Sequence, residues 1–156
     1  MPYLLDGMNV IHKVGKLYEK LDAEGPEAAV RLLVSELLRL WPNAKGRVEI
    51  VVDKGGGRYG RSQPVGGILV RYSAQDESAD DLIVRLVKKS PAYYVLVSDD
   101  KRLNASLRRD LTGVMSAKDF FKRIAEKGKN EGENGEKPFS PRGNDVEFWG
   151  KIFGVK

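Results

Sequence analysis

Short apolar runs of strand length alternate along this chain with longer segments whose apolar residues repeat at helical spacing. The apolar runs are residues 3–5, 48–52, 68–72, 93–97 and 113–115. Helical periodicity is strongest over residues 79–87, and it is also present at 26–41, 101–109 and 117–125. Strands that alternate with helices favour a mainly parallel sheet covered on both faces. We therefore expect an α/β fold, a three-layer α/β/α sandwich with a mainly parallel central sheet.

Composition excludes several kinds of chemistry. The 156 residues include no Cys and a single His, His12, so disulfides, thiolate metal sites, cysteine nucleophiles and multi-histidine sites are excluded or disfavoured. If this chain is an enzyme, carboxylates are the groups expected to do the chemistry. The chain has no apolar run long enough to cross a bilayer and no secretory signal pattern, so we expect a cytoplasmic protein with no membrane partner.

The net charge of +5 favours a polyanionic partner such as RNA. Basic and acidic residues balance within residues 128–156, so the whole excess of positive charge lies in residues 1–127. The sequence alone leaves the choice between RNA and DNA open, because that choice depends on contacts to the 2′-hydroxyl.

Composition also divides the chain. Residues 1–127 carry the periodic segments and are predicted to form one domain. Residues 128–145 are rich in Gly, Asn, Glu and Lys without apolar periodicity, and are predicted to be a flexible linker. Residues 146–156 form an apolar tail, which either packs on its own domain or docks on a partner or a second copy, so a homodimer is an open alternative.

Acidic residues directly follow three of the apolar runs. Asp6, Asp53 and Asp99 stand where the runs 3–5, 48–52 and 93–97 end. In a parallel sheet these ends line the ligand crevice, so the three carboxylates are expected to converge. The alternative is structural, because an Asp after a strand often caps the next helix, as Asp99 or Asp100 could do for a helix near Lys101.

Helical periodicity selects a fourth acid. The apolar stripe of residues 79–87 is centred near Ala79, which places Asp80 at its border and Asp81 on roughly the opposite side. Asp80 is therefore the better candidate for a site residue, although an acid in a first helical turn is also favoured by the helix dipole. Clustered carboxylates repel one another unless a cation neutralises them, and oxygen ligands suit Mg²⁺ or Mn²⁺.

Four ordered segments resemble a known family. Residues 5–11 (LDGMNVI), 50–53 (IVVD), 77–80 (ESAD) and 97–99 (VSD) are similar to motifs of the YacP-like NYN domain family, within the PIN-like nuclease superfamily. The resemblance implies a PIN-like fold, an acidic metal site and endoribonuclease activity on single-stranded RNA, which for some relatives takes place on ribosomes. It carries Asp53 over as a metal-site acid beside the metal ligands Asp6, Asp80 and Asp99. It also carries over Asn9 and Ser98 as polar positioning residues.

A Gly-rich segment at residues 55–67 supplies a candidate RNA-binding loop. It resembles a phosphate-binding P-loop only loosely, because Arg61 stands at the Lys position and no helix is expected to follow. We expect basic side chains to bind phosphates and Tyr59 to stack on a base. The alternative is an ordinary solvated loop. The predicted RNA-binding residues are Lys54, Arg58, Tyr59, Arg61 and Arg71.

The leading hypothesis is a Mg²⁺- or Mn²⁺-dependent endoribonuclease that hydrolyses phosphodiester bonds of single-stranded RNA, with ribosome-associated mRNA as one candidate substrate. Two alternatives stay open. One is a non-catalytic RNA-binding module in which the acids are helix caps. The other is a phosphatase of the haloacid-dehalogenase kind with Asp6 as nucleophile, which is disfavoured because Met8 stands where that family has its second Asp.

Overall fold

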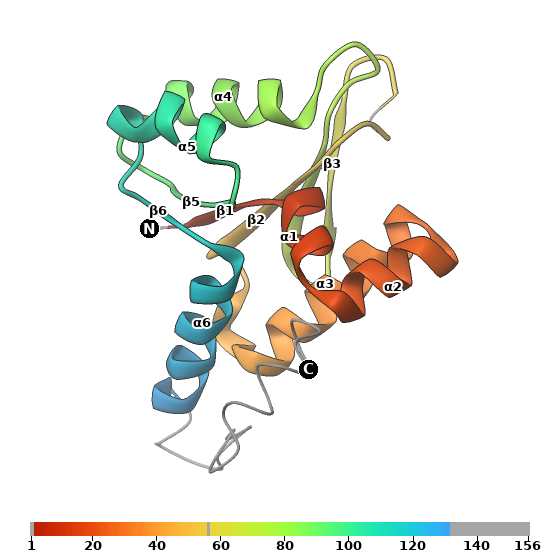
Figure 1. Cartoon of the computed structure of the whole chain (residues 1–156), viewed down its shortest axis with the longest axis vertical. Coiled ribbons are helices and arrows are strands. Elements are labelled where there is room, and N and C mark those ends of the chain that lie inside the picture. The colour runs from red at the N-terminus through yellow and green to blue at the C-terminus, as the bar shows by residue number, and fades with distance from the viewer. Residues whose placement is uncertain (1, 56, 132–156) are drawn as a thin grey trace. The chain divides into compact units, whose positions relative to one another are not determined.

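The computed structural model describes residues 2–55 and 57–131. The chain divides into two compact units (Figure 1). The first comprises Met1–Val10 and Lys45–Ala117. The second comprises Ile11–Ala44 and the described part of Lys118–Lys156.

A six-stranded sheet forms the centre of the first unit. Its strands are β1 (Tyr3–Asp6), β2 (Val48–Val52), β3 (Arg61–Val65), β4 (Ile68–Tyr72), β5 (Val95–Val97) and β6 (Gly113–Met115). Their order across the sheet is β3-β4-β2-β1-β5-β6, and each neighbouring pair is parallel except β3 and β4. The predicted α/β fold with a mainly parallel sheet is therefore confirmed.

Two helices, α4 (Ala79–Lys89) and α5 (Lys101–Leu107), pack on one face of this sheet. The apolar stripe of α4 is buried against the strands, as its periodicity predicts. Leu4 of β1, Val51 of β2 and Leu96 of β5 lie in the same core cluster and are fully buried. Burial of a large aliphatic side chain is worth about 1.5–3 kcal/mol, so this contact fixes where α4 begins relative to the ends of the strands.

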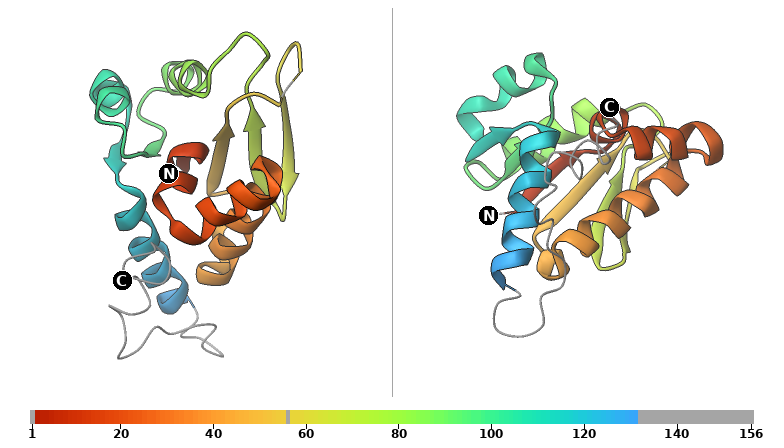
Figure 2. Two further views of the ribbon diagram at one scale, coloured as in Figure 1. Left: turned by 45° about the vertical axis from the view of Figure 1, so that its right-hand side comes forward. Right: turned by 60° about the horizontal axis from the view of Figure 1, so that its bottom comes forward.

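Strand β3 occupies part of the segment predicted to be a loop. Residues 55–67 read as a Gly-rich loop, but Arg61–Val65 pairs antiparallel with β4 as the edge strand of the sheet (Figure 2). Gly66 and Gly67 make the two-residue connection with positive φ angles of 58° and 88°. Successive positive φ angles are what a tight hairpin turn requires. Two of the glycines that suggested a loop therefore form a hairpin turn between β3 and β4.

Helix α1 (Gly7–Lys13) follows β1 without an intervening loop, and α2 (Gly15–Glu24) comes next, although the apolar periodicity marks no helix before residue 26. Helix α2 begins without a side-chain cap that would mark it in the sequence. Gly7 is required by close packing, because a Cβ there would lie 2.6 Å from the carbonyl oxygen of Val51. The absence of a side chain at this position lets the chain turn directly from β1 into α1.

The second unit contains α2, α3 (Pro26–Leu40), the short 3₁₀ helix η1 (Pro42–Ala44) and most of α6 (Ala117–Glu131). Pro26 lies in the first turn of α3, as predicted. Helices α2 and α3 pack side by side, with an ion pair of 2.7 Å between Lys16 and Glu36 (Figure 2). The indole of Trp41 donates to the carboxylate of Glu131 at 2.9 Å.

Helix α6 continues to Glu131, past the linker boundary predicted at residue 128. Gly128 is buried in the helix, and a Cβ there would overlap the carbonyl oxygen of Leu40. The glycine that suggested a linker is thus a packing residue. The rest of the predicted linker and the apolar tail, residues 132–156, lie outside the described residues.

Replacing Gly128 with Ala tests this contact. Ala is the better helix former by about 1 kcal/mol, so an exposed glycine would gain stability from the change. Here the overlap with Leu40 is expected to dominate and to lower the free energy of unfolding by about 1–3 kcal/mol in a urea titration. Lys129→Ala, at the exposed neighbouring position, is the control and is expected to change it by less than about 0.5 kcal/mol. A more stable Gly128→Ala variant would contradict the contact.

Among residues 2–55 and 57–131, no helix has the length and apolar character needed to span a membrane.

Candidate active site

The predicted site lies where three neighbouring parallel strands end. Strand β1 is in the middle of the sheet, with β2 on one side and β5 on the other. Strands β2 to β4 lie on one side of β1, and the later strands β5 and β6 lie on the other side. The strand order therefore reverses at β1. Crevices at such reversals are where open α/β sheets bind ligands. Asp6, Asp53 and Ser98 stand at these three strand ends.

Asp6 is the buried acid of the site. Only 6% of its surface is exposed, and its Oδ2 accepts a hydrogen bond of 3.2 Å from the Ser98 hydroxyl. The backbone N–H of Asn9 also donates to this carboxylate. Burial, followed by the charge of Asp80, raises the pKa of Asp6 from 3.8 to about 6, although both hydrogen bonds act in the opposite direction. Asp6 is thus held in one orientation and resists ionisation.

Asp80, in the first turn of α4, is the second acid. Desolvation raises the pKa of Asp80, and the charges of Asp100, Asp81 and Asp53 raise it further. Asp100 also raises the pKa of Asp6. Carboxylates from β1, from the end of β2, from α4 and from the end of β5 therefore repel one another at this edge of the sheet.

Asp100, the neighbour of the predicted Asp99, has a charge that raises the pKa of both Asp6 and Asp80. The Oδ2 of Asp99 accepts the backbone N–H of Ala117 at 3.2 Å, at the start of α6. Asp100 is the N-cap of α5, and its Oδ1 accepts the N–H groups of Arg102 and Leu103. The family motif ends at Asp99, and the structure adds Asp100 next to it as a further candidate acid of the site.

Asn9 and Ser98 connect the ends of β1 and β5. The Asn9 Oδ1 accepts the backbone N–H of Asp99 at 2.8 Å, and the Ser98 Oγ accepts the N–H of Asp100 at 3.1 Å. Sequence reasoning missed a further member, Asn104, whose Nδ2 donates to the Ser98 carbonyl at 2.8 Å. The spacing in the sequence could have identified Asn104, because it lies four residues after Asp100 and therefore on the same side of α5.

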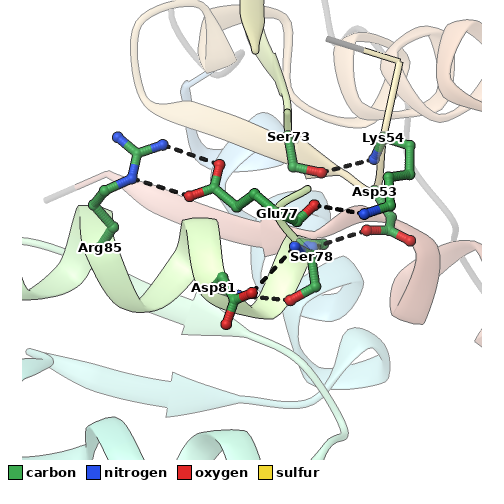
Figure 3. Close-up of polar contacts among 8 residues, drawn as sticks. Asp53, Lys54, Ser73, Glu77, Ser78, Asp81 and Arg85 are labelled. Carbon is green, nitrogen blue, oxygen red and sulfur yellow. Dashed lines mark hydrogen bonds and ion pairs between the residues drawn. The ribbon is translucent and has the colours of Figure 1, made fainter. Parts of the chain in front are cut away.

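Asp53 combines a charge with a structural bond. Its side chain is exposed at the end of β2, and its Oδ1 accepts the backbone N–H of Ala79 at 2.9 Å (Figure 3). Its charge raises the pKa of the adjacent Asp80. Asp53 therefore attaches the beginning of α4 to the end of β2.

The predicted RNA-binding residues fall into two groups. Lys54, Arg61 and Arg71 are engaged within the chain: Lys54 Nζ with backbone carbonyls, Arg61 with the Gly55 carbonyl and Gln63, and Arg71 in an ion pair of 2.8 Å with Glu49. Arg58 lies 5.9 Å from the ring centroid of Tyr59, whose surface is 87% exposed. Lys54 and Arg61 are exposed as well, but their charged groups are engaged with other parts of the chain, whereas Arg58 and Tyr59 contact each other at the surface.

The acids suit a hard divalent cation in their chemistry. Within the described chain, no group of three Asp, Glu, His or Cys side chains is already arranged to hold a metal ion. Mg²⁺ commonly binds through one or two carboxylates and completes its shell with water and substrate phosphate oxygens, so a preassembled cage is not required. The mutual repulsion of Asp6, Asp80 and Asp100 is what a bound cation would relieve.

A mainly parallel α/β sheet with carboxylates gathered at the ends of its central strands is the arrangement of a nuclease-like domain. The model of the YacP-like NYN domain family matches residues 3–147, and the chain belongs to this family. The family predicted from the ordered motifs is thus confirmed.

Solved structures agree with this fold. The crystal structure of the W164L mutant of Rae1 (YacP) from Bacillus subtilis is 19% identical, with 98% of this chain and 92% of that chain covered and a TM-score of 0.63. A second Rae1 (YacP) crystal structure from Bacillus subtilis is 18% identical over 86% of this chain and 79% of that chain, with a TM-score of 0.61. At these identities the likeness establishes the fold alone. No curated protein matches the chain.

Proposed function

We propose that this protein is a Mg²⁺- or Mn²⁺-dependent endoribonuclease that hydrolyses phosphodiester bonds of single-stranded RNA. The observation that carries the proposal is the buried Asp6, whose pKa is raised to about 6 next to the charges of Asp80 and Asp100. Such repulsion at a strand-order reversal is costly for folding, and strongly perturbed acids in a crevice are typical of functional sites. A bound cation would offset the repulsion among the carboxylates and could bind the phosphate of a phosphodiester substrate.

Asp6, Asp80 and Asp100 are the residues that would hold the ion. When bound, the ion would supply an activated water and would offset the charge that develops on the phosphoryl oxygens. The Ser98 hydroxyl and the Asn9 N–H orient the Asp6 carboxylate and favour its ionised form. Asp53 and the caps at Ser78 and Asp100 hold α4 and α5, so the carboxylates stay in place without substrate.

The substrate side of the proposal rests on exposed basic and aromatic residues of the first unit. Arg58 and Tyr59 lie at the surface of the loop after β2, where a guanidinium can bind phosphate and a phenol ring can stack on a base. Lys101 and Arg102 are exposed at the start of α5, directly after Asp100. The proposed substrate includes ribosome-associated mRNA in the cytoplasm. The proposed oligomeric state is a homodimer.

An assay of end-labelled RNA tests the proposal. The full chain is expected to cut a single-stranded oligoribonucleotide internally with Mg²⁺ or Mn²⁺ and to lose this activity in EDTA, with recovery when the ion is restored. Asp76→Asn, an exposed acid outside the cluster, is the matched control and is expected to cut like the wild type. Full cleavage in EDTA would contradict a metal-dependent reaction.

A second candidate function, a non-catalytic RNA-binding module, is favoured by one observation. Asp53, Asp99 and Asp100 each accept hydrogen bonds from the first N–H groups of a helix, which is a sufficient structural use for an acid. This alternative predicts RNA binding that weakens with salt, and no turnover with any divalent ion. Measuring binding and turnover on the same oligonucleotide therefore separates the two functions.

A further inference from the structure

The turn after β2 makes an unusual set of contacts with the segment that leads into α4. Lys54 Nζ donates to the carbonyl oxygens of Gln75 at 3.1 Å and Glu77 at 3.0 Å. Its backbone N–H donates to the Ser73 hydroxyl at 2.7 Å. With the bond from Ala79 to Asp53, two consecutive residues therefore attach to four positions between Ser73 and Ala79. Figure 3 shows the bonds from Lys54 to Ser73 and Glu77.

The backbone at Lys54 indicates that its side chain matters. Lys54 has a φ of 63°, in the left-handed region that is strained for residues other than glycine. Glycine adopts this conformation without strain, and three glycines follow Lys54 directly in the chain, yet position 54 itself is a lysine. A strained residue persists where the surrounding contacts over-determine it, and here the ammonium group supplies two of those contacts.

The segment held by Lys54 ends at the acid of α4. Glu77 is fixed at both ends: its carbonyl accepts from Lys54, and its carboxylate pairs with Arg85 through two bonds of 3.1 Å. Ser78 then caps α4 in a reciprocal box with Asp81, and Asp80 stands in that first turn. Any shift of residues 75–79 would therefore move Asp80 relative to Asp6.

We propose that Lys54 is a positioning residue, which holds the start of α4 and so places Asp80 opposite Asp6, and that it does not bind substrate phosphate. Its consequence for catalysis rests on the proposed function. Lys54 and Arg58 are both exposed, but the Lys54 ammonium group uses two of its three donors on carbonyl oxygens, whereas the Arg58 guanidinium lies by the exposed ring of Tyr59. The two basic residues of this turn thus have different tasks.

The two roles give opposite kinetic results. Lys54→Met keeps most of the length of the unbranched side chain and removes the ammonium group. We expect kcat to fall about 10-fold to 100-fold, the scale of a misplaced catalytic group, with KM for RNA unchanged. The slope of log Kd against log salt for RNA is expected to stay at the wild-type value.

Arg58→Met is expected to raise KM and to reduce that slope by about 0.7, the contribution of one phosphate contact on a single strand. Lys89→Met, on the exposed end of α4, is the neutral control.

A structural readout makes the test independent of turnover. Amide hydrogen exchange in the full chain is expected to be at least 10-fold faster at Ala79 and Asp81 in Lys54→Met, because their N–H groups bond to Asp53 and Ser78, while amides of β1 and β2 keep their protection. Lys54→Gly provides a second variant, because glycine accepts the φ of 63° and removes the same ammonium group, so a folding defect of the methionine variant does not obscure the result.

Unchanged exchange and unchanged kcat in both variants would overturn the proposal. A salt slope that falls in Lys54→Met as it does in Arg58→Met would also overturn it, and would make Lys54 a phosphate ligand. If the wild-type chain binds RNA without turnover, the proposed function fails, and hydrogen exchange alone then decides whether Lys54 holds the start of α4.

Discussion

Asp6→Asn is expected to lose RNA cleavage by about 100-fold to 1000-fold, the loss seen when one preorganised electrostatic contact is removed from an active site. Asn is nearly isosteric and can still accept the hydrogen bonds of Ser98 and Asn9 through its Oδ1. The change therefore removes the charge and leaves the shape. The initial rate of cleavage of a single-stranded RNA with saturating Mn²⁺ measures the effect, and Asp76→Asn is the control.

The same substitution is expected to stabilise the fold in metal-free buffer. The pKa of Asp6 is about 6 in the folded protein against 3.8 ordinarily, so the folded state binds this proton more tightly than the unfolded chain does. Stability then falls as the pH rises from about 4 to about 6, and above pH 6 the cost reaches at most about 3 kcal/mol. Asn does not ionise, so at pH 8 the variant is expected to be more stable by about 1–3 kcal/mol.

This gain should shrink as the pH is lowered from 6 toward 4, because the wild-type carboxyl then takes up its proton. Urea titrations in EDTA at pH 8, 6 and 4.5 measure it. If Asp6→Asn instead lowers the free energy of unfolding at every pH, Asp6 is an ordinary buried residue. Loss of activity together with a gain in stability is the signature of a group whose charge is kept for function.

Asp100→Asn is expected to reduce cleavage by about 100-fold, whereas Asp99→Asn is expected to stay close to the wild type. Both residues cap helices, and Asn caps a helix about as well as Asp does, so neither change should cost much stability. Of the two, Asp100 is the one whose charge raises the pKa of Asp6 and of Asp80. The pair of variants therefore compares two neighbouring acids with similar caps and different positions.

The reverse result, with Asp99→Asn inactive and Asp100→Asn active, would show that Asp99, at the end of the family motif, is the third acid of the site and that Asp100 is only a helix cap. Thermal unfolding of both variants serves as the control for the caps.

The strands and the place of the site could be predicted from sequence because they depend on local patterns. Apolar runs followed by Asp6, Asp53 and Ser98 mark the ends of β1, β2 and β5, and the stripe on α4 separates Asp80 from Asp81. In each case the residue's own neighbours in the chain determine its direction.

The rest depends on contacts between distant residues. Gly7 and Gly128 have the composition of turns and linkers, but each is required where another backbone segment passes close by, at Val51 and Leu40. The choice between Asp99 and Asp100 depends on the position of the start of α6. Likewise, Lys54 reads as a phosphate ligand until the carbonyl groups of residues 75 and 77 are placed beside it.

The most direct test of the acidic metal site is a crystal of the full chain soaked in Mn²⁺, with data collected for anomalous scattering. A peak is expected about 2 Å from a carboxylate oxygen of Asp6, with Asp80 or Asp100 as a second ligand. A well-ordered Asp6 with no peak beside it, in a crystal that binds Mn²⁺ elsewhere, would contradict it.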